Sequence, residues 1–264
     1  MCRWAAWLGQ PIFLSQIVSD PGHSLIEQSR QADQCKTTTN ADGFGVAWYD
    51  ARPEPGLYRD VFPAWSDPNL RSLCAQVRSG LFLSHIRAST GTAISRNNCH
   101  PFVAGRWSFM HNGQIGGYDR FRRDADMMIP DALYPDRRGA TDSEALFLVA
   151  LAEGLDCDPV AAIGASIARF EALSRRNGTT PHMRVACAFS DGSRLYALRY
   201  SSDRIAPSLY YRWNEDWQGW AVVSEPLEAD QTGWIEVPPG TFCEFHGRDV
   251  VFRNFAPSVA TIAA

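Results

Sequence analysis

The chain has 264 residues, of which 45% are hydrophobic and 20% charged, and its formal net charge at pH 7 is −4. These fractions are close to the globular averages of about 45–50% and 25%, which excludes a disordered, collagen-like or long coiled-coil protein. No run of Lys and Arg is long enough to follow a phosphate backbone, so we expect no nucleic-acid partner.

Membrane and metal signals are equally weak. The longest apolar run, Ala145 to Ala152, has eight residues, whereas a bilayer span needs ~20. The N-terminal apolar stretch stops at Gly9-Gln10-Pro11, too early for a signal-peptide core. Seven cysteines without a Cys-x-x-Cys spacing fit neither a disulfide scaffold nor a zinc ribbon. We therefore expect a cytoplasmic protein with reduced thiols, no membrane segment and no metal site.

The first half of the chain mixes strands and helices. Apolar runs predict strands over residues 3–8, 43–49, 81–87 and 106–111. A capping box at Ser24-Leu-Ile-Glu27 predicts a helix that continues to about residue 34, and residues 67–77 also resemble a helix. Residues 120–140, charged and interrupted by proline, predict a surface excursion with a short helical piece.

Two helices and a series of hairpins follow. Helices are expected from Thr141 and over residues 158–174. Strands 183–189 and 195–200 flank Asp191-Gly192, a strong hairpin signal, and further short strands are expected at residues 210–213, 220–223, 234–237, 241–245 and 250–252. This order favours a layered α+β fold with antiparallel sheets. No linker divides the chain, so we expect one domain over residues 1–264.

Cys2 is the first candidate for chemistry because of its position. Aminopeptidases generally remove Met1 before a small residue, which would leave Cys2 with both a thiol and a free α-amine. An α-amine of pKa about 7.7–8.0 can accept a proton near neutral pH, and a thiolate is a strong nucleophile. Taken alone, Cys2 is a weak signal, and a buried strand cysteine without a catalytic role is the simpler interpretation.

Two further candidates stand at the ends of apolar strands. Arg87, after residues 81–86, is placed to bind a carboxylate through paired, charge-assisted hydrogen bonds, although a surface ion pair is the simpler interpretation. His111-Asn112-Gly113 offers a side-chain amide and a backbone N–H, which together can form an oxyanion hole. In isolation the Asn-Gly pair is also a common turn.

Thr141-Asp142-Ser143-Glu144 is the last candidate. Thr141 and Glu144 fit a helix-capping box, but this role does not require Asp at position 142. Asp142 could instead neutralise a substrate ammonium group. A free amino acid with an amide side chain needs an anion site, a cation site, a nucleophile and an oxyanion hole, and Arg87, Asp142, Cys2 and Asn112-Gly113 supply one of each.

In this order the motifs resemble those of the class II glutamine amidotransferases, which are N-terminal nucleophile hydrolases. Cys2 resembles the family nucleophile, and Arg87 with Thr90 resembles the Arg-x-x-Thr pattern that binds the α-carboxylate of glutamine. Asn98-Cys-His-Pro-Phe102 resembles the Asn-x-His-Pro segment of the family. His111-Asn-Gly113 and Asp142 match its oxyanion and amine-binding motifs.

The resemblance implies a four-layer αββα sandwich of two antiparallel sheets and a single glutamine amidotransferase type-2 domain. Ala88 and Gly91 depart from the Trp and His of many synthase-attached members. Asp42-Gly-Phe-Gly-Val-Ala-Trp48 and Ser224-Glu-Pro-Leu227 resemble the stand-alone branch, which includes proteins of the YafJ type and hydrolases of γ-glutamyl amides. No role is assigned to Ser224-Glu225-Pro226, which could simply be a turn that ends a strand.

The expected activity is hydrolysis of the γ-amide of glutamine or of a γ-glutamyl compound through a γ-glutamyl thioester, without a metal or organic cofactor. Alternatives are a glutaminase subunit that passes ammonia to a separate synthase, and a silent interaction protein with the same fold. A third is a hydrolase whose nucleophile is an internal cysteine, Cys35 or Cys187. The true substrate, a synthase or peptidase partner subunit and homo-oligomer formation are left open.

Overall fold

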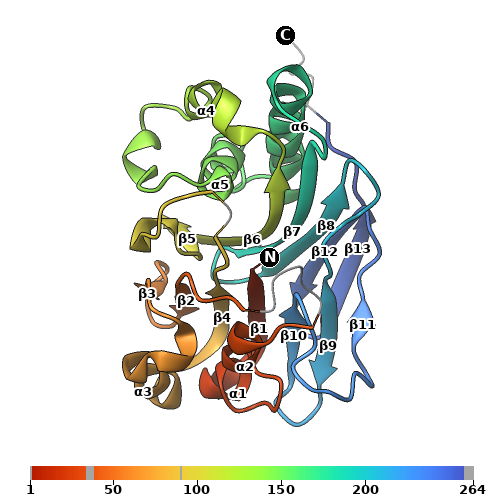
Figure 1. Cartoon of the computed structure of the whole chain (residues 1–264). Helices are drawn as coiled ribbons and strands as arrows, with labels where there is room; N and C mark the ends of the chain where they lie inside the picture. Colours follow the sequence, from red (N-terminus) through yellow and green to blue (C-terminus); the bar gives the residue numbers. More distant parts are fainter. Residues whose placement is uncertain (1, 34–38, 90, 259–264) are drawn as a thin grey trace.

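Two antiparallel sheets form the centre of the computed structural model, which describes residues 2–33, 39–89 and 91–258 (Figure 1). The seven-stranded sheet has the order β11-β9-β10-β1-β4-β2-β3. Its strands are β1 (Arg3–Phe13), β2 (Phe44–Tyr49), β3 (Gly56–Asp60), β4 (Arg78–Ile86), β9 (Tyr210–Asn214), β10 (Gly219–Val223) and β11 (Ile235–Glu236).

The six-stranded sheet has the order β13-β12-β8-β7-β6-β5. Its strands are β5 (Phe102–Ala104), β6 (Trp107–Ile115), β7 (Met183–Ser190), β8 (Leu195–Ser201), β12 (Thr241–His246) and β13 (Asp249–Asn254). The helices are α1 (Ser15–Val18), α2 (Leu25–Arg30), α3 (Pro68–Gln76), α4 (Tyr118–Asp126), α5 (Asp142–Ala152) and α6 (Pro159–Asn177), with short 3₁₀ turns η1 (Ala64–Ser66), η2 (Arg96–Asn98) and η3 (Tyr134–Asp136).

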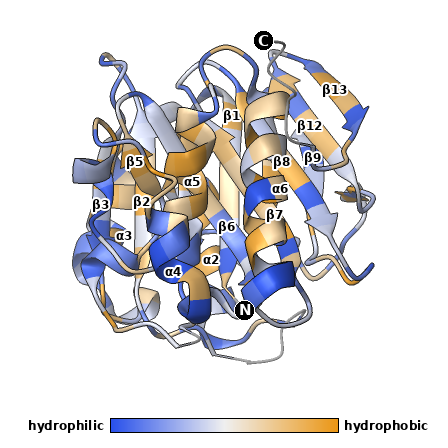
Figure 2. Ribbon diagram, turned by 90° about the horizontal axis from the view of Figure 1, so that it is seen from above, coloured by the Kyte–Doolittle hydropathy of each residue, from blue (hydrophilic) through white to orange (hydrophobic). Residues whose placement is uncertain are grey.

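Three hydrophobic clusters define four layers. One packs α1, α2 and α3 against the outer face of the seven-stranded sheet, and another packs α4, α5 and α6 against the six-stranded sheet. The third lies between the two sheets and includes Trp4, Leu83 and Met110. Figure 2 shows that α5 is largely hydrophobic, as expected for a helix with eight consecutive buried residues. The expected four-layer αββα sandwich is confirmed.

Alternation along β1 decides which side chains meet which layer. Trp4 and Ala6 belong to the cluster between the sheets, whereas Ala5 and Trp7 pack toward the helices α1 to α3. This is the two-residue period of a strand that is buried on both faces. The Nε1 of Trp4 donates a hydrogen bond to the carbonyl of Ala186, 3.2 Å away, which joins the start of β1 to the opposite sheet.

Several predicted boundaries need correction. β1 continues to Phe13 instead of ending near residue 8, because an irregularity in its pairing with β4 between Leu8 and Ile12 absorbs the Gly-Gln-Pro break. α2 ends at Arg30, well before residue 34, since the backbone is extended at Gln31. The short strands β3 and β5 were not predicted. The other predicted strands and helices are present, with ends shifted by up to four residues.

Helix caps follow the predicted residues more closely than helix ends do. Ser24 Oγ accepts the Glu27 N–H, and Thr141 Oγ1 accepts the Glu144 N–H at 3.2 Å. The Glu144 carboxylate, however, accepts from the backbone of Arg138 and Gly139, so its side chain supports the preceding loop. No helix in the described part of the chain combines the length and apolar character needed to cross a bilayer.

The aromatic core between the six-stranded sheet and its helices gives the first prediction. Phe189 has no exposed surface, and its ring centroid lies 5.1 Å from that of Tyr196. Phe189→Ala should lower the free energy of unfolding by about 3–5 kcal/mol, through lost burial and the cavity that remains. Urea denaturation measures this change. The matched control is Phe62→Ala, at a side chain that is 59% exposed, where a loss within about 0.5 kcal/mol is expected. Equal losses would contradict the assignment of the core.

Candidate active site

Cys2, Arg87 and Asn112 come together at one end of the layer between the two sheets, and Asp142 stands at the start of α5, in contact with the end of β6. Cys2 precedes β1, Arg87 follows β4, Asn112 lies within β6 and Asp142 begins α5. Because strand residues alternate, Cys2 shares the inner face of β1 with Trp4. The side-chain amide of Asn112 donates to the carbonyl oxygen of Cys2 at 2.6 Å, which connects the two sheets at this point.

Cys2 is held against the segment that follows β4. Its Sγ accepts a hydrogen bond from the Ala88 N–H at 3.3 Å and lies 3.5 Å from the Ala88 carbonyl oxygen. Burial raises the pKa of the Cys2 thiol, an effect that the Ala88 hydrogen bond and the charges of Arg87 and Arg3 oppose. The thiol therefore needs a base before it can act as a nucleophile at neutral pH.

Arg87 is 3% exposed and its guanidinium is held by neutral acceptors. Nη2 donates to Thr92 Oγ1 at 2.6 Å and to Ser89 Oγ at 3.1 Å, and Nη1 donates to the Asp42 carbonyl at 3.3 Å. Among the residues that the structure describes, none places a carboxylate in an ion pair with Arg87. A buried cation with neutral neighbours is suited to bind an anionic ligand.

Gly113 follows Asn112 at a position where no side chain fits. A Cβ there would lie 1.9 Å from the carbonyl oxygen of Arg184 and 2.3 Å from His111 Nε2. Glycine is thus required by close approach of β7 to β6. The motif also contains His111, whose Nδ1 is 2.9 Å from Ser143 Oγ and whose Nε2 is 3.3 Å from the Arg184 carbonyl.

This pattern assigns the tautomer of His111. The Arg184 carbonyl can only accept, so Nε2 carries a proton, and burial lowers the pKa of His111, which favours the neutral ring with an unprotonated Nδ1. The Ser143 hydroxyl lies 2.9 Å from this Nδ1 and 3.1 Å from Asp142 Oδ1, so these two acceptors compete for its one proton. Asp142 lies beside this pair. Its Oδ1 accepts the Ser143 N–H at 2.7 Å, and its Oδ2 accepts the Ile115 N–H at 3.2 Å. The carboxylate is therefore fixed between α5 and the end of β6.

Asn98 joins the two loops that carry the charged residues. Its Nδ2 donates to the Ala93 carbonyl at 2.8 Å, and its Oδ1 accepts the Ala140 N–H at 2.7 Å. The Ala93 carbonyl is also within 3.3 Å of Arg87 Nη2. The Asn-x-His-Pro segment thus holds the arginine loop against the start of α5.

Two buried histidines, His85 and His100, pack against each other close to the candidate site. His85 and His100 have ring centroids 4.2 Å apart, and burial lowers the pKa of each, for His85 to about 3. Both rings are neutral and add no charge to the site. His85 lies two residues after Leu83 in β4, so its side chain points to the same face of the sheet. This face borders the layer between the two sheets, to which Asn112 also points.

The remaining sequence candidates are placed as follows. Thr90, Met1 and Cys35 lie outside the described residues. Cys187 has no exposed surface and packs in the core beneath α5 and α6, and burial raises the pKa of its thiol. Cys187 is therefore inaccessible to a substrate, which removes it as an internal nucleophile.

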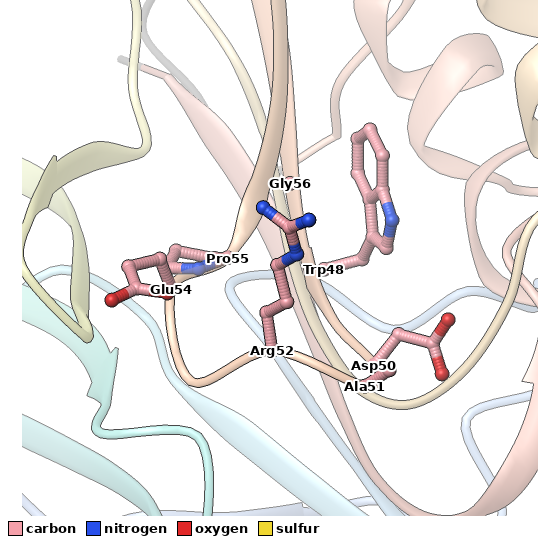
Figure 3. A pocket seen from close by; sticks show the side chains of 7 residues that line it. All are labelled: Trp48, Asp50, Ala51, Arg52, Glu54, Pro55 and Gly56. Atoms are coloured by element: carbon pink, nitrogen blue, oxygen red, sulfur yellow. The ribbon is translucent and has the colours of Figure 1, made fainter.

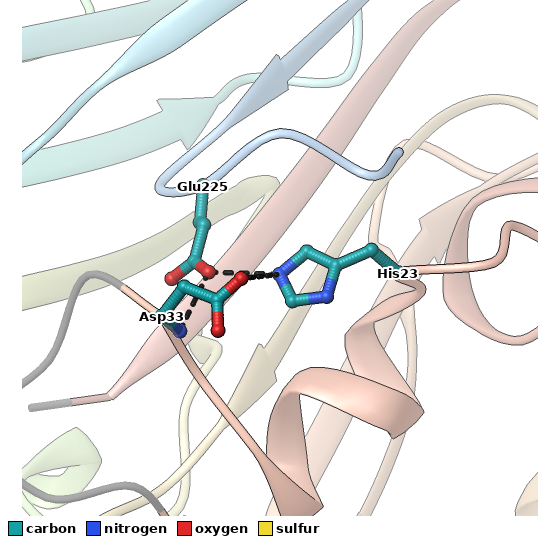
Figure 4. Close-up of side chains that lie close together, drawn as sticks. All are labelled: His23, Asp33 and Glu225. Carbon is teal, nitrogen blue, oxygen red and sulfur yellow. Dashed lines mark hydrogen bonds and ion pairs between the residues drawn. The ribbon is translucent and has the colours of Figure 1, made fainter. Parts of the chain in front are cut away.

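Sequence reasoning missed a second polar cluster on the other face of the seven-stranded sheet. Here the Glu225 carboxylate contacts Arg3 and His23, and the backbone N–H of Asp33 donates to it at 2.9 Å (Figure 4). The only signals in the sequence were a charged residue next to Cys2 and the unassigned Ser-Glu-Pro motif.

The same cluster contains residue types that can bind a metal ion. Ligand atoms of His23, Asp33 and Glu225 lie within 4.8 Å of one another. Arg3 Nε is 2.8 Å from Glu225 Oε2, so a guanidinium already compensates the carboxylate and disfavours a bound cation. The arrangement fits a hydrogen-bonded ionic cluster better than a metal centre.

A hollow of about 610 Å³ lies elsewhere, at the turn between β2 and β3 (Figure 3). It is lined by Trp48, Asp50, Ala51, Arg52, Glu54, Pro55 and Gly56. Trp48 pairs with Phe82, six residues before Ala88 along β4, a separation of roughly 20 Å in a strand. The hollow offers no nucleophile, so Cys2 and its neighbours remain the candidate site.

Comparison with known proteins shows the family to which the chain belongs. Residues 23–211 match the family model described as glutamine amidotransferases class-II. The chain is 32% identical to the probable glutamine amidotransferase DUG3 of Saccharomyces cerevisiae, over 90% of this chain and 80% of the relative. It is 30% identical to the gamma-glutamyl-hercynylcysteine sulfoxide hydrolase of Mycolicibacterium smegmatis, over 90% and 92% of the two chains.

Solved structures give the same result. A glutamine aminotransferase class-II domain protein from Silicibacter pomeroyi superposes with a TM-score of 0.79 and 54% sequence identity, covering 97% of this chain and all of that one. The glutamine phosphoribosylpyrophosphate amidotransferase of B. subtilis shares the fold, with a TM-score of 0.65 and 13% identity over 98% of this chain and 50% of its own.

His23 gives a prediction on pH. The hydrogen bond to Glu225 raises the pKa of His23, so its contribution to stability is complete below the unfolded pKa of about 6.5 and is lost as the pH rises through the folded value. Urea denaturation should show a larger loss of unfolding free energy for His23→Gln at about pH 5.5 than at about pH 9. His246→Gln, at an exposed position, controls for the general response. A loss that is equal at both pH values would contradict the ion pair.

Proposed function

Because this chain belongs to the class II glutamine amidotransferases, we propose that it hydrolyses the γ-amide of glutamine or of a larger γ-glutamyl compound. One observation carries the proposal: Cys2 is bonded at once to the segment of Arg87 and Ala88 and to the amide of Asn112. The Cys2 thiol, the Arg87 guanidinium and the Asn112 amide therefore lie in one region. The Asp142 carboxylate stands at the N-terminal end of α5. Residues 1–264 form one catalytic domain in this proposal.

The reaction begins with proton transfer from the Cys2 thiol to its own α-amine, once Met1 has been removed. This step is needed because burial raises the pKa of the thiol, whereas an α-amine with a pKa of about 7.7–8.0 is partly neutral at physiological pH. The thiolate then attacks the γ-carbonyl carbon. The new C–S bond converts the carbonyl oxygen into an oxyanion.

Asn112 and Gly113 stabilise that oxyanion. The Asn112 amide carries two N–H groups, of which one bonds to the Cys2 carbonyl and the second is assigned to the oxyanion. One such donor is worth roughly 3 kcal/mol of transition-state stabilisation in other enzymes. As the C–N bond breaks, the Cys2 ammonium returns the proton to the leaving ammonia or amine. Water then cleaves the γ-glutamyl thioester, releasing glutamate and the thiol.

The amino-acid end of the substrate is zwitterionic, and the site offers one group for each charge. Arg87 binds the α-carboxylate, because its buried guanidinium has neutral neighbours. Asp142 binds the α-ammonium from the N-terminal end of α5, where Ser143 and Ile115 orient its carboxylate. These contacts fix the γ-carbonyl relative to Cys2. Possible substrates then differ only in the amine that is released from the γ-carbonyl.

The leaving group decides between the alternatives. The mycobacterial relatives are named for a γ-glutamyl compound larger than glutamine, which supports a γ-glutamyl amide as substrate. Ala88, small where many synthase-attached members carry Trp, flanks the nucleophile and is compatible with a larger group. Delivery of ammonia to a separate synthase is the alternative, and a product assay with free glutamine and with γ-glutamyl amides separates the two.

Labelling with an electrophilic glutamine analogue, 6-diazo-5-oxo-L-norleucine, tests the nucleophile. Intact-mass spectrometry should show a chain without Met1 that gains one adduct, and peptide mapping should place the adduct on Cys2, since its thiol contacts Ala88, next to Arg87. Cys2→Ala should gain none. Cys157→Ser, which removes an exposed thiol, should label as fully as the unmodified chain.

An adduct on another cysteine would overturn the assignment of Cys2. Loss of Met1 with no adduct would indicate a pocket that rejects free glutamine and would direct the search to larger γ-glutamyl amides. Retention of Met1 with no adduct calls for repeating the experiment after the methionine has been removed in vitro.

Head-group binding gives a separate kinetic prediction. Arg87→Ala removes charge-assisted hydrogen bonds worth roughly 1.5–3 kcal/mol, so KM should rise about 10- to 100-fold, with a smaller fall in kcat if the ground and transition states are bound alike. Steady-state kinetics with the best substrate measures both constants. Arg96→Ala, in the same loop but with a side chain that is 66% exposed, is the control and should leave KM unchanged. An unchanged KM in Arg87→Ala would argue against carboxylate binding.

A further inference from the structure

The Ser224-Glu225-Pro226 motif directly follows β10 and contacts the residues that come after Cys2. Trp4 N–H donates to Ser224 Oγ at 2.9 Å, and the Ser224 N–H donates to the Trp4 carbonyl at 3.0 Å. The hydroxyl of Ser224 also lies 3.2 Å from that carbonyl. Ser224 therefore extends the β1–β10 ladder toward the end of the chain at which Cys2 stands.

Glu225 reaches the same segment through its side chain. Its Oε2 lies 2.8 Å from Arg3 Nε, and both side chains are 2% exposed. Its Oε1 lies 2.8 Å from His23 Nε2 and 2.9 Å from the Asp33 N–H (Figure 4). One buried carboxylate thus joins the start of β1 to the residues that precede and follow α2.

Because both side chains are buried, the Glu225 carboxylate strongly affects the stability of the charged Arg3 side chain. A buried ion that loses its partner is strongly destabilising, because its desolvation is no longer compensated. Without Glu225, Arg3 would lose the buried carboxylate that lies 2.8 Å from its Nε, and its side chain would be less firmly held on the outer face of the sheet. Arg3 is the first paired residue of β1, opposite Ile86, so its movement displaces Cys2 directly.

The position of Cys2 needs such a restraint. In the proposed mechanism, removal of Met1 leaves Cys2 at the end of the chain, and chain ends fray unless contacts hold them. Asn112 and Ala88 hold Cys2 from the inner face of the sheet. Arg3 points to the outer face by strand alternation, so the Glu225 contact holds the same segment from the opposite side.

We propose that Glu225 is a positioning residue for the nucleophile: through Arg3 it fixes the thiol and amine of Cys2 relative to the Asn112 donor. This proposal rests on the proposed amidohydrolase function. Glu225 itself touches neither substrate nor reacting atoms. In this proposal two residues of the Ser-Glu-Pro motif have separate roles. Ser224 aligns the backbone of Trp4, and Glu225 holds the side chain of Arg3 on the outer face of the sheet.

The cluster also contributes to the electrostatic environment of the Cys2 thiol. The positive charge of Arg3 lowers the pKa of the Cys2 thiol, as does that of Arg87 on the inner face. Glu225 offsets the charge of Arg3, with His23 and Asp33 as the other ionisable groups of the cluster. Removing only the negative charge therefore leaves a more positive surrounding, which favours the thiolate.

A double-mutant cycle tests the proposal with the full-length mature chain. Glu225→Gln should lower kcat about 10- to 100-fold, as expected for a small displacement of the reacting groups, while KM changes less than about threefold. In an Arg3→Met background, the same substitution should change kcat by less than about twofold, because the group through which it acts is gone. Glu171→Gln is the matched control, since Glu171 is a buried glutamate paired with Arg175 on α6, far from Cys2 in the fold.

The pH dependence of Cys2 alkylation by iodoacetamide, mapped by mass spectrometry, is the second measurement and needs no substrate. Its midpoint should shift to lower pH in Glu225→Gln and stay in place in Glu171→Gln. A fall in melting temperature with kcat and midpoint unchanged would show a purely structural role and overturn the proposal. An equal loss of kcat in both backgrounds would also overturn it, because Glu225 would then act independently of Arg3.

Two remaining outcomes are distinguishable. If Glu225→Gln alone does not fold, the Arg3→Met/Glu225→Gln variant should fold, since the poorly compensated charge is removed, and failure of both would contradict the ionic origin of the effect. If the unmodified chain hydrolyses no γ-glutamyl amide, the proposed function fails. The alkylation midpoint then still decides whether Glu225 controls the environment of Cys2.

Discussion

The structure depends on how firmly the start of β1 is held between two layers. Cys2 is bonded to Asn112 and Ala88 on one side, while Arg3 is paired with Glu225 on the other. A strand buried on both faces allows these opposite restraints, because successive side chains point to opposite layers. A central position in the seven-stranded sheet thus holds Cys2 and Arg3 in place, whereas residues near a chain end are often mobile.

Arg87 follows the end of β4 and Asp142 begins α5, and buried amide side chains hold the loops next to these two residues. Asn98 bridges the arginine loop to the start of α5, and Asn112 bridges the two sheets. An amide both donates and accepts, so one side chain can join two loops without adding charge. For this reason the Asn-x-His-Pro segment matters to the site although it supplies no ligand or nucleophile, and its effect on Arg87 and Asp142 is exerted through the backbone of their loops.

Much of the fold and of the site could be predicted from the sequence, because the signals were local. Periodicity located most strands, and Ser24 and Thr141 marked helix starts that their hydroxyl contacts confirm. The extension of β1 past Gly9 and the early end of α2 could not be predicted, since sheet pairing and tertiary contacts decide them. The ion pair of Arg3 with Glu225 joins residues more than two hundred positions apart, and only the topology that places β10 beside β1 brings them together.

The charge distribution in the proposed site is compatible with a zwitterionic ligand. Burial keeps His85, His100 and His111 neutral, so three potential cations near Arg87 carry no charge. The charge of Arg3 is compensated by Glu225 on the far side of the sheet. What remains for a ligand in the proposed site is the guanidinium of Arg87 and the carboxylate of Asp142, held on different elements by neutral hydrogen bonds. A ligand with one carboxylate and one ammonium would complete both at once, whereas a singly charged ligand would leave a charge unpaired, at a cost that rises with burial.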